Sequence, residues 1–232
     1  MIKLSQNCTS WCNLQSFACC HDAASNQSFS PGTGLLPSGS STTPVLTFHG
    51  PFTFTKGERY LFDSGFLKQE GLYIWTIRDK ADNINYVHYI GETGYFARRQ
   101  RQHLIQITGL NYPILDADFA RQGVKKIIWH GMARDKSRNA AADLLESYNE
   151  VSQKVTDYIS LINIYFAPIH LPLHLRRHIQ DCLIWNFRTQ YPELKRFFPD
   201  DSHAAFKPER LGHTLLLQLP EAIAGIDREQ SI

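Results

Sequence analysis

The sequence contains no apolar run of about 18 residues, the length that a transmembrane helix needs. Its first residues, MIKLSQNCTSWCNLQ, also lack the continuous apolar stretch of a secretory signal. We therefore expect a cytoplasmic protein with no membrane partner. The formal net charge of +2 is too small to indicate nucleic acid by itself, and the 43% of hydrophobic residues is typical of a globular protein.

The first 44 residues are poor in charge, with Lys3 and Asp22 as their charged side chains, and end in SPGTGLLPSGSSTTP. Such a stretch buries little apolar surface, so we expect a flexible tail over 1–44 and a single domain over 45–232. The tail has cysteines in the pattern Cys-x3-Cys-x6-Cys-Cys-His, without the paired Cys-x2-Cys knuckles of a zinc module. A zinc site and a free, reduced tail are the alternatives, and the spacing favours the second. The residues are Cys8, Cys12, Cys19, Cys20 and His21.

The rest of the chain predicts an α+β fold, a small, mostly antiparallel sheet flanked by helices, with the N-terminal extension in front of it. The polar segment RDKADNIN joins two of the predicted strands, and eight residues suit an antiparallel hairpin better than a parallel crossover. The apolar run 214–219 should cover the sheet. The predicted strands are 45–54, 71–77, 86–92, 124–131 and 161–169. The predicted helices are 95–106, 113–122, 137–155 with Ser137 as its cap, and one with Pro172 in its first turn that ends near Gln190.

Positive charge is concentrated between Gly94 and Arg138, where nine basic residues stand against three acidic ones. This excess could attract a phosphate backbone, although ordinary protein surfaces are often locally basic as well. The basic residues proposed to contact nucleic acid are Arg98, Arg101, Lys125 and Lys126.

Two tripeptides and a helix carry the chemical signal. Gly71-Leu72-Tyr73 is followed by Tyr89-Ile90-Gly91, with the two tyrosines sixteen residues apart. Arg99 follows ten residues after the second tyrosine, and His103 follows one helical turn later. This pattern resembles that of the GIY-YIG nuclease superfamily, with leucine in place of isoleucine in the first tripeptide.

The resemblance implies roles for four of these residues. Tyr73 would activate the attacking water and pass its proton towards His103, Tyr89 would position the phosphate, and Arg99 would stabilise the transition state. The chemistry agrees, because an arginine fork matches phosphate oxygens and a histidine passes protons near neutral pH. A phenol with a pKa of about 10 is a poor base, so we expect nearby cations to lower the Tyr73 pKa.

The same residues also have an ordinary structural interpretation. In a hairpin the two tyrosines can share a sheet face, and residues four apart share a helix face. Taken singly, each could be a strand aromatic, a solvated arginine or a core histidine. Their combined spacing favours the functional interpretation.

The carboxylate that binds metal in this superfamily, in a Glu-x-x-Leu-Ile setting, falls on Gln180 of the segment QDCLI. Gln180 is therefore the candidate metal ligand for Mg²⁺ or Mn²⁺, but a neutral amide lacks the negative charge that a hard cation needs. Three explanations are open: an engineered replacement of glutamate, a natural loss of catalysis with binding retained, or Glu146 as the true carboxylate. Asp181 is a poor substitute, because it projects about 100° further around the helix.

The superfamily often anchors its site with an asparagine, for which Asp201 and Asn186 are the candidates here. We expect a metal-dependent endonuclease that hydrolyses a phosphodiester of DNA with an activated water. The alternatives are a catalytically silent nucleic-acid-binding module and an interaction domain whose tyrosine pair is coincidental. RNA stays open as a substrate. A homodimer and two sequential cuts stay open as routes to cutting a duplex, because one active site cuts one strand.

Overall fold

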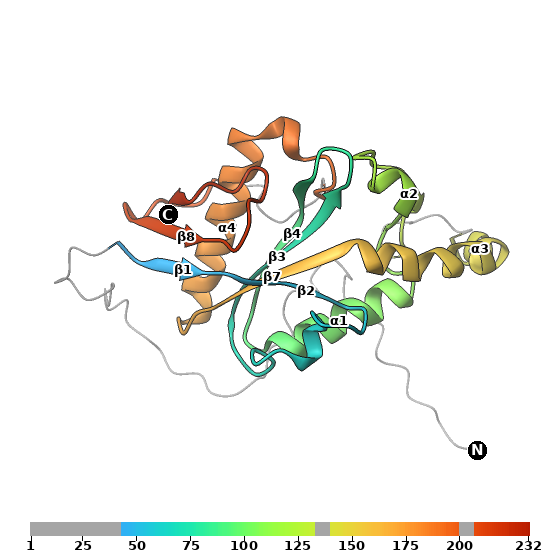
Figure 1. Ribbon diagram of the computed structural model, residues 1–232, viewed down its shortest axis with the longest axis horizontal. Helices are drawn as coiled ribbons and strands as arrows, with labels where there is room; N and C mark the ends of the chain where they lie inside the picture. The colour runs from blue at the N-terminus through green and yellow to red at the C-terminus, as the bar shows by residue number, and fades with distance from the viewer. Residues whose placement is uncertain (1–42, 133–139, 200–206) are drawn as a thin grey trace, which may run out of the picture. The chain divides into compact units, whose positions relative to one another are not determined.

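The computed structural model describes residues 43–132, 140–199 and 207–232 (Figure 1). The predicted zinc or thiol tail, Ser137 and Asp201 lie outside these residues. The helices are α1 (Phe96–Thr108), α2 (Ala117–Ala120), α3 (Ala140–Leu161) and α4 (Leu173–Gln190), with short 3-10 turns η2 (Leu61–Asp63) and η3 (Pro192–Leu194). The strands are β1 (Val45–Thr47), β2 (His49–Thr53), β3 (Gly71–Asp79), β4 (Ile84–Thr93), β5 (Ile114–Leu115), β6 (Ile127–Trp129), β7 (Ile162–Pro168), β8 (Thr214–Gln218) and β9 (Glu229–Ser231). The predicted α+β class is confirmed.

A four-stranded sheet in the order β2-β7-β3-β4 forms the centre of the described part of the chain, and each neighbouring pair of strands is antiparallel. The predicted hairpin is confirmed, with β3 and β4 joined by a short turn. Tyr73 lies opposite Gly91, and Trp75 lies opposite Tyr89. Because cross-strand partners point to the same face, both tyrosines of the motif face one side of the sheet.

A bulge interrupts the hairpin between Trp75 and Thr76, where the register shifts by one residue and His88 has no opposite partner. Such an extra residue re-aims the side chains around it. His88 and the following Tyr89 both contact Trp75, at centroid distances of 6.4 and 5.7 Å. The bulge therefore brings two consecutive polar aromatic side chains to one face.

Separate hydrophobic cores cover the two faces of the sheet, so β3 is buried continuously from Gly71 to Ile77. Tyr73 and Trp75 belong to the core on the side of α1 and α3, whereas Leu72 and Ile74 belong to the core on the side of α4. This alternation explains why the strand is apolar throughout rather than at every second position.

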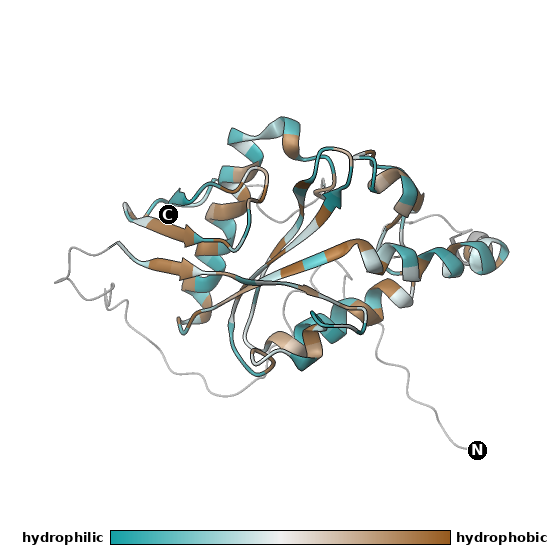
Figure 2. Ribbon diagram, in the orientation of Figure 1, coloured by the Kyte–Doolittle hydropathy of each residue, from teal (hydrophilic) through white to brown (hydrophobic). Residues whose placement is uncertain are grey.

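Helix α1 is amphipathic, with hydrophilic and hydrophobic residues both visible along it in Figure 2. Its first residue, Phe96, is fully buried and stacks on Phe166 of β7 with ring centroids 4.0 Å apart. The Phe96 amide also donates to the carbonyl of Gln69, just before β3. These contacts dock the start of α1 against the sheet.

Helix α4 packs on the other face, together with a second sheet in the order β1-β8-β9. The helical period predicts a buried side of α4 with Leu175, Ile179, Cys182, Leu183 and Phe187, and of these Leu175 is partly buried and the other four are buried. Pro172 stands at the N-cap, one position before the predicted first turn. The run 214–219 contains β8, which pairs in parallel with β1. Its alternate leucines are buried in the core that α4 shares with the sheet, as expected for a segment that covers the sheet.

Two predicted elements are wrong in the middle of the chain. Residues 113–122 were expected to form one helix, but they contain β5 and the four-residue α2. Asp116 accepts hydrogen bonds from the amides of Asp118 and Phe119, so it caps a short helix and separates it from the strand. The predicted strand 124–131 shortens to β6, because its partner β5 has only two residues.

The first predicted strand divides at Phe48 into β1 and β2, which join different sheets. Helix α3 continues to Leu161, six residues past its predicted end at Val155. The helical period predicts Leu145, Val151 and Val155 on its buried side, and Val151 and Val155 are buried, whereas Leu145 is 78% exposed. The preceding residue, Leu144, packs against the core, and the next position lies about 100° further around the helix. No helix within the described ranges is long and apolar enough to cross a membrane.

Replacing Phe96 by alanine should lower the free energy of unfolding by about 3–5 kcal/mol, because it removes a buried ring that stacks on the sheet. Urea denaturation measures this change. Ile105 of the same helix is 64% exposed, so Ile105→Ala is the matched control and should cost less than about 0.5 kcal/mol. Equal losses from the two variants would contradict the docking of α1 through Phe96.

Candidate functional site

Four residues of the predicted site meet between the hairpin and α1. Tyr73 comes from β3, Tyr89 from β4, and Arg99 and His103 from α1. The rings of Tyr73 and Tyr89 stack at a centroid distance of 5.9 Å, and His103 packs edge-on against both. The spacing of four residues on α1 places Arg99 and His103 one turn apart on the side that faces the sheet.

The hydroxyl of Tyr73 is the centre of the hydrogen bonding. It lies 2.8 Å from Nε2 of His103, and Nε of Arg99 donates to it at 3.3 Å. A guanidinium, a phenol and an imidazole therefore form one continuous chain.

The glycines of both tripeptides are required by close approaches. A Cβ atom on Gly91 would lie 2.4 Å from the Tyr73 hydroxyl oxygen, and one on Gly71 would lie 2.1 Å from the carbonyl oxygen of Ala167. Both distances are far below van der Waals contact. Gly91 thus provides the space for the Tyr73 phenol, and Gly71 lets β3 approach β7.

Burial sets the protonation of the two groups at the centre. Burial raises the pKa of Tyr73 well above its usual value, and Tyr89 adds to the rise while Arg99 opposes it. Burial and then the charge of Arg99 hold the pKa of His103 well below its usual value. The expectation that the site lowers the Tyr73 pKa is therefore wrong for the protein chain alone, because loss of hydration outweighs one nearby cation.

Arg99 keeps its charge in this setting. Burial disfavours the cation, but the adjacent phenols of Tyr73 and Tyr89 outweigh it and raise the Arg99 pKa. At neutral pH the site thus contains a protonated phenol, a neutral imidazole and a guanidinium cation. Tyr73 and His103 are 0% and 1% exposed, whereas Tyr89 and Arg99 are partly exposed, so an incoming ligand meets Arg99 and Tyr89 first.

Sequence reasoning missed three neighbours of these four residues. Nε1 of Trp75 donates to Oε1 of Gln100 at 3.1 Å, and Trp75 packs 4.6 Å from the His103 ring. Tyr112 places its hydroxyl 3.3 Å from Nδ1 of His103. The period of α1 could have placed Gln100 on the same face as His103, three residues further on. Tyr112 lies in a loop, and no sequence pattern signals its contact.

The predicted nucleic-acid contacts divide into two groups. Arg98 and Arg101 are exposed on α1 beside Arg99, and Arg101 also lies 5.3 Å over the ring of Phe62. Lys125 instead donates to the carbonyl of Phe198 at 3.3 Å.

Lys126 is also engaged locally. It lies 3.7 Å from a carboxylate oxygen of Asp116 and 4.1 Å over the ring of Phe119. The cations of α1 are thus the ones next to the site.

Gln180 stands apart from these four residues. It is partly buried on α4, the helix that packs on the opposite face of the sheet, and no described hydrogen bond or ring contact joins it to Tyr73 or Tyr89. One turn earlier, Arg176 contacts Glu70 and Glu92 at 2.5 and 3.5 Å. Glu92 follows Gly91 directly, so this ion pair links α4 to the strand that carries Tyr89.

The other candidates for the missing groups have different surroundings. Glu146 is exposed on α3. Asn186 is buried and donates to Gln230 and Ser231 at 3.0 and 3.2 Å, so its amide fastens β9 to α4.

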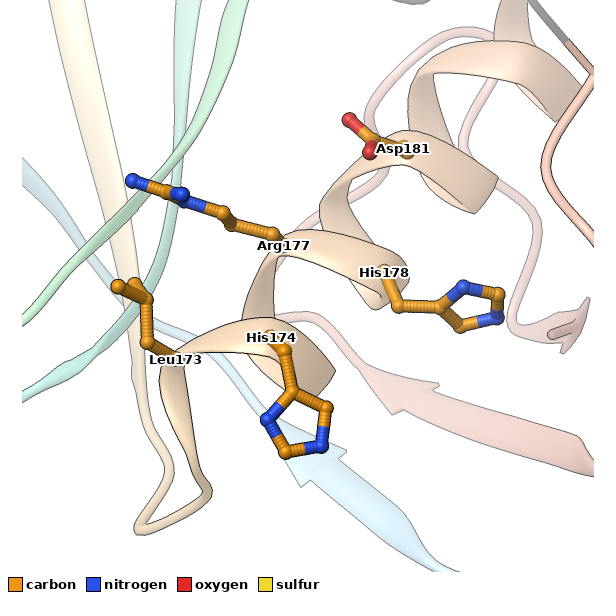
Figure 3. Close-up of a pocket in the computed structure, with 5 residues that line it drawn as sticks. All are labelled: Leu173, His174, Arg177, His178 and Asp181. Atoms are coloured by element: carbon orange, nitrogen blue, oxygen red, sulfur yellow. The ribbon is translucent and has the colours of Figure 1, made fainter. Parts of the chain in front are cut away.

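A shallow hollow on α4 has Asp181 on its edge, and Figure 3 shows that its side chains do not converge. His174 and His178 point to one side of the helix, Arg177 points to the other, and Asp181 points away from both histidines. Across the described ranges, no group of three or more histidines, cysteines and acids is placed to hold a metal ion. Among the described residues, the position expected to hold the metal ligand therefore offers no carboxylate oxygen for Mg²⁺ or Mn²⁺, because Gln180 is a neutral amide.

No family model, curated protein or solved structure matches the chain.

Replacing Gly91 by alanine should displace the Tyr73 phenol and lower the free energy of unfolding by about 1–3 kcal/mol or more, because the new methyl group overlaps the hydroxyl. Urea denaturation measures the loss. The control is Gly94→Ala, where the nearest atom is the terminal nitrogen of Arg176 at 3.6 Å and little should change. A tolerated Gly91→Ala would mean that Tyr73 does not lie against the β4 backbone.

Proposed function

We propose that the protein is a GIY-YIG-type endonuclease domain that acts on a phosphodiester of DNA. The observation that carries this proposal is the hydrogen-bonded chain from Arg99 through Tyr73 to His103, with Tyr89 beside it. The chain combines a charged group suited to phosphate with a proton relay, and hydrolysis of a phosphodiester needs both.

In the proposed reaction, the partly exposed Arg99 and Tyr89 hold the non-bridging oxygens of the phosphate. The Arg99 cation stabilises the negative charge that grows on them as water attacks phosphorus and the bond to the leaving oxygen breaks. Tyr73 remains protonated and acts as a relay. It accepts the proton of the attacking water while it gives its own proton to Nε2 of His103, and the leaving oxygen takes a proton from solvent.

The buried position of Tyr73 adds a requirement. Its hydroxyl has no exposure, so Tyr89 or Arg99 must move when substrate binds and let the attacking water reach it. The guanidinium that already contacts the hydroxyl is the group best placed to turn towards the phosphate. No step is assigned to a cation, because Gln180 offers it no carboxylate, and the Gln180→Glu variant tests what a cation adds.

Gln180→Glu should convert supercoiled plasmid to the open circle in Mg²⁺ or Mn²⁺, and the present sequence should cut at least about 100-fold more slowly. The reason is that a glutamate supplies the negative charge that a hard cation needs and that Gln180 lacks, and even the outer-shell partners of a metal are worth roughly 10- to 100-fold. Gln190→Glu adds the same charge at the exposed end of α4 and should gain nothing. If Gln180→Glu is inert on DNA and RNA with both cations, the hydrolase proposal fails.

A catalytically silent nucleic-acid-binding module is the second candidate, and the neutral side chain at position 180 favours it. In that case Arg98, Arg99 and Arg101 contact the phosphate backbone of the nucleic acid, and Gln180→Glu produces no cutting.

Replacing both Arg98 and Arg101 by alanine should reduce the slope of log K against log salt for duplex DNA by about 2, because each lost phosphate contact removes about 0.9. Binding titrations at several salt concentrations measure the slope, and parallel titrations with RNA show which nucleic acid is preferred. Lys207 and Arg228 are exposed cations outside α1, and their double alanine variant is the control. Equal losses in the two variants would show that binding depends on net charge and not on α1.

A further inference from the structure

His103 has hydrogen-bond partners on both ring nitrogens. Nε2 lies 2.8 Å from the hydroxyl of Tyr73, and Nδ1 lies 3.3 Å from the hydroxyl of Tyr112. A neutral imidazole has one proton, and its two neighbours decide which nitrogen carries it. The relay proposed above works only if Nε2 is free to accept a proton.

The unequal burial of the two tyrosines selects the tautomer. Tyr73 is fully buried, and its oxygen already accepts a hydrogen bond from Arg99, so its own proton has Nε2 of His103 as its acceptor among the described residues. If Nε2 carried the proton instead, the buried Tyr73 proton would lose that acceptor, which is costly. Tyr112 is only partly buried, so its own proton can reach water when its oxygen accepts from Nδ1.

The loop that carries Tyr112 is held firmly against β6. Nε1 of Trp129 donates to the carbonyl of Leu110 at 2.7 Å, and the amide of Met132 donates to the same carbonyl at 3.0 Å. A Cβ atom on Gly131 would lie 2.6 Å from the carbonyl oxygen of Asn111, so the two segments pass in close contact. These contacts hold Tyr112 on the Nδ1 side of the His103 ring.

We propose that Tyr112 is a positioning residue that accepts the Nδ1 proton of His103 and so keeps Nε2 open to take the proton of Tyr73. The catalytic part of this inference rests on the proposed function, whereas the hydrogen-bond arrangement does not. When Nε2 takes the proton, both ring nitrogens carry protons and the Tyr112 oxygen continues to accept from Nδ1. Tyr73, Tyr89, Arg99 and Tyr112 are the titratable groups that face the ring, and Arg99 is the cation among them.

The core contains a natural control for this arrangement. His88 also lies between a carbonyl and a phenol, with Nδ1 2.8 Å from the carbonyl oxygen of Phe197 and Nε2 2.7 Å from the hydroxyl of Tyr158. Tyr158→Phe therefore removes a tyrosine hydroxyl from a different histidine in the same core and should leave His103 unchanged.

The first test is a long-range proton–nitrogen NMR spectrum of the histidine rings in the full chain, which distinguishes the two tautomers. We expect His103 to carry its proton on Nδ1. Tyr112→Phe keeps the ring but removes the acceptor, and it should raise the ratio of the Nε2–H to the Nδ1–H form about fivefold, the effect of one neutral hydrogen bond. A wild-type His103 protonated on Nε2, or an unchanged ratio in Tyr112→Phe, would overturn the positioning role.

The second test measures rates in the Gln180→Glu background. Tyr112→Phe should lower kcat at least about tenfold with KM unchanged, because it removes the acceptor for Nδ1–H of the charged imidazole ring that the relay forms and leaves the phosphate contacts in place. Tyr158→Phe should leave kcat within about twofold. A shifted tautomer with an unchanged kcat would overturn the catalytic part. An inert background would instead count against the proposed function, while the NMR result still decides the place of Tyr112.

Discussion

The close approach of the Tyr73 phenol to the backbone of Gly91 determines where every other group of the candidate site lies. The hairpin register places a glycine opposite Tyr73, and the missing side chain leaves room for the ring to lie across β4. From that position the hydroxyl reaches His103 on α1, and Arg99 reaches back to the same oxygen. A shift of one residue in the register would turn Tyr89 to the other face and put a side chain where the phenol lies.

Burial determines which side chains of this site are neutral and which is charged. A phenol and an imidazole inside the core both stay neutral, since water is absent around either charged form, and the hydrogen bond between them is strong for the same reason. Arg99 lies at the boundary with solvent and keeps its charge. Its cation contacts Tyr73 on the inner side, and in the proposed reaction the same cation acts outwards on the phosphate.

The parts of this site that could be predicted from the sequence are those set by local periodicity. Two strands joined by eight residues imply a hairpin, and a spacing of four places Arg99 and His103 on one face of α1. The protonation of Tyr73 could not be predicted, because it depends on the depth at which Phe96 and Phe166 seat the helix against the sheet. Contacts across loops were equally hidden, as for Lys125, which meets a carbonyl 73 residues further along the chain.

Position 180 raises a different question, because the surrounding helix is already rich in compensated charge. Arg176 is only 5% exposed, and it contacts Glu70, Glu92 and the carbonyl of Leu171. Arg177 lies 3.7 Å from the second oxygen of Glu92. Glu92 is thus the carboxylate closest in sequence to the second tripeptide, yet two guanidinium groups occupy it.

A glutamine one turn beyond Arg176 leaves that balance undisturbed, whereas a glutamate would add an uncompensated negative charge beside it. Such a charge would have to attract a cation or compete with Glu92 for an arginine. A cation would then be bound on the α4 side of the sheet, and competition would free Glu92, which follows Gly91 in β4. A charge at position 180 therefore has to act across the sheet to reach the tyrosines, which belong to the core on the other side.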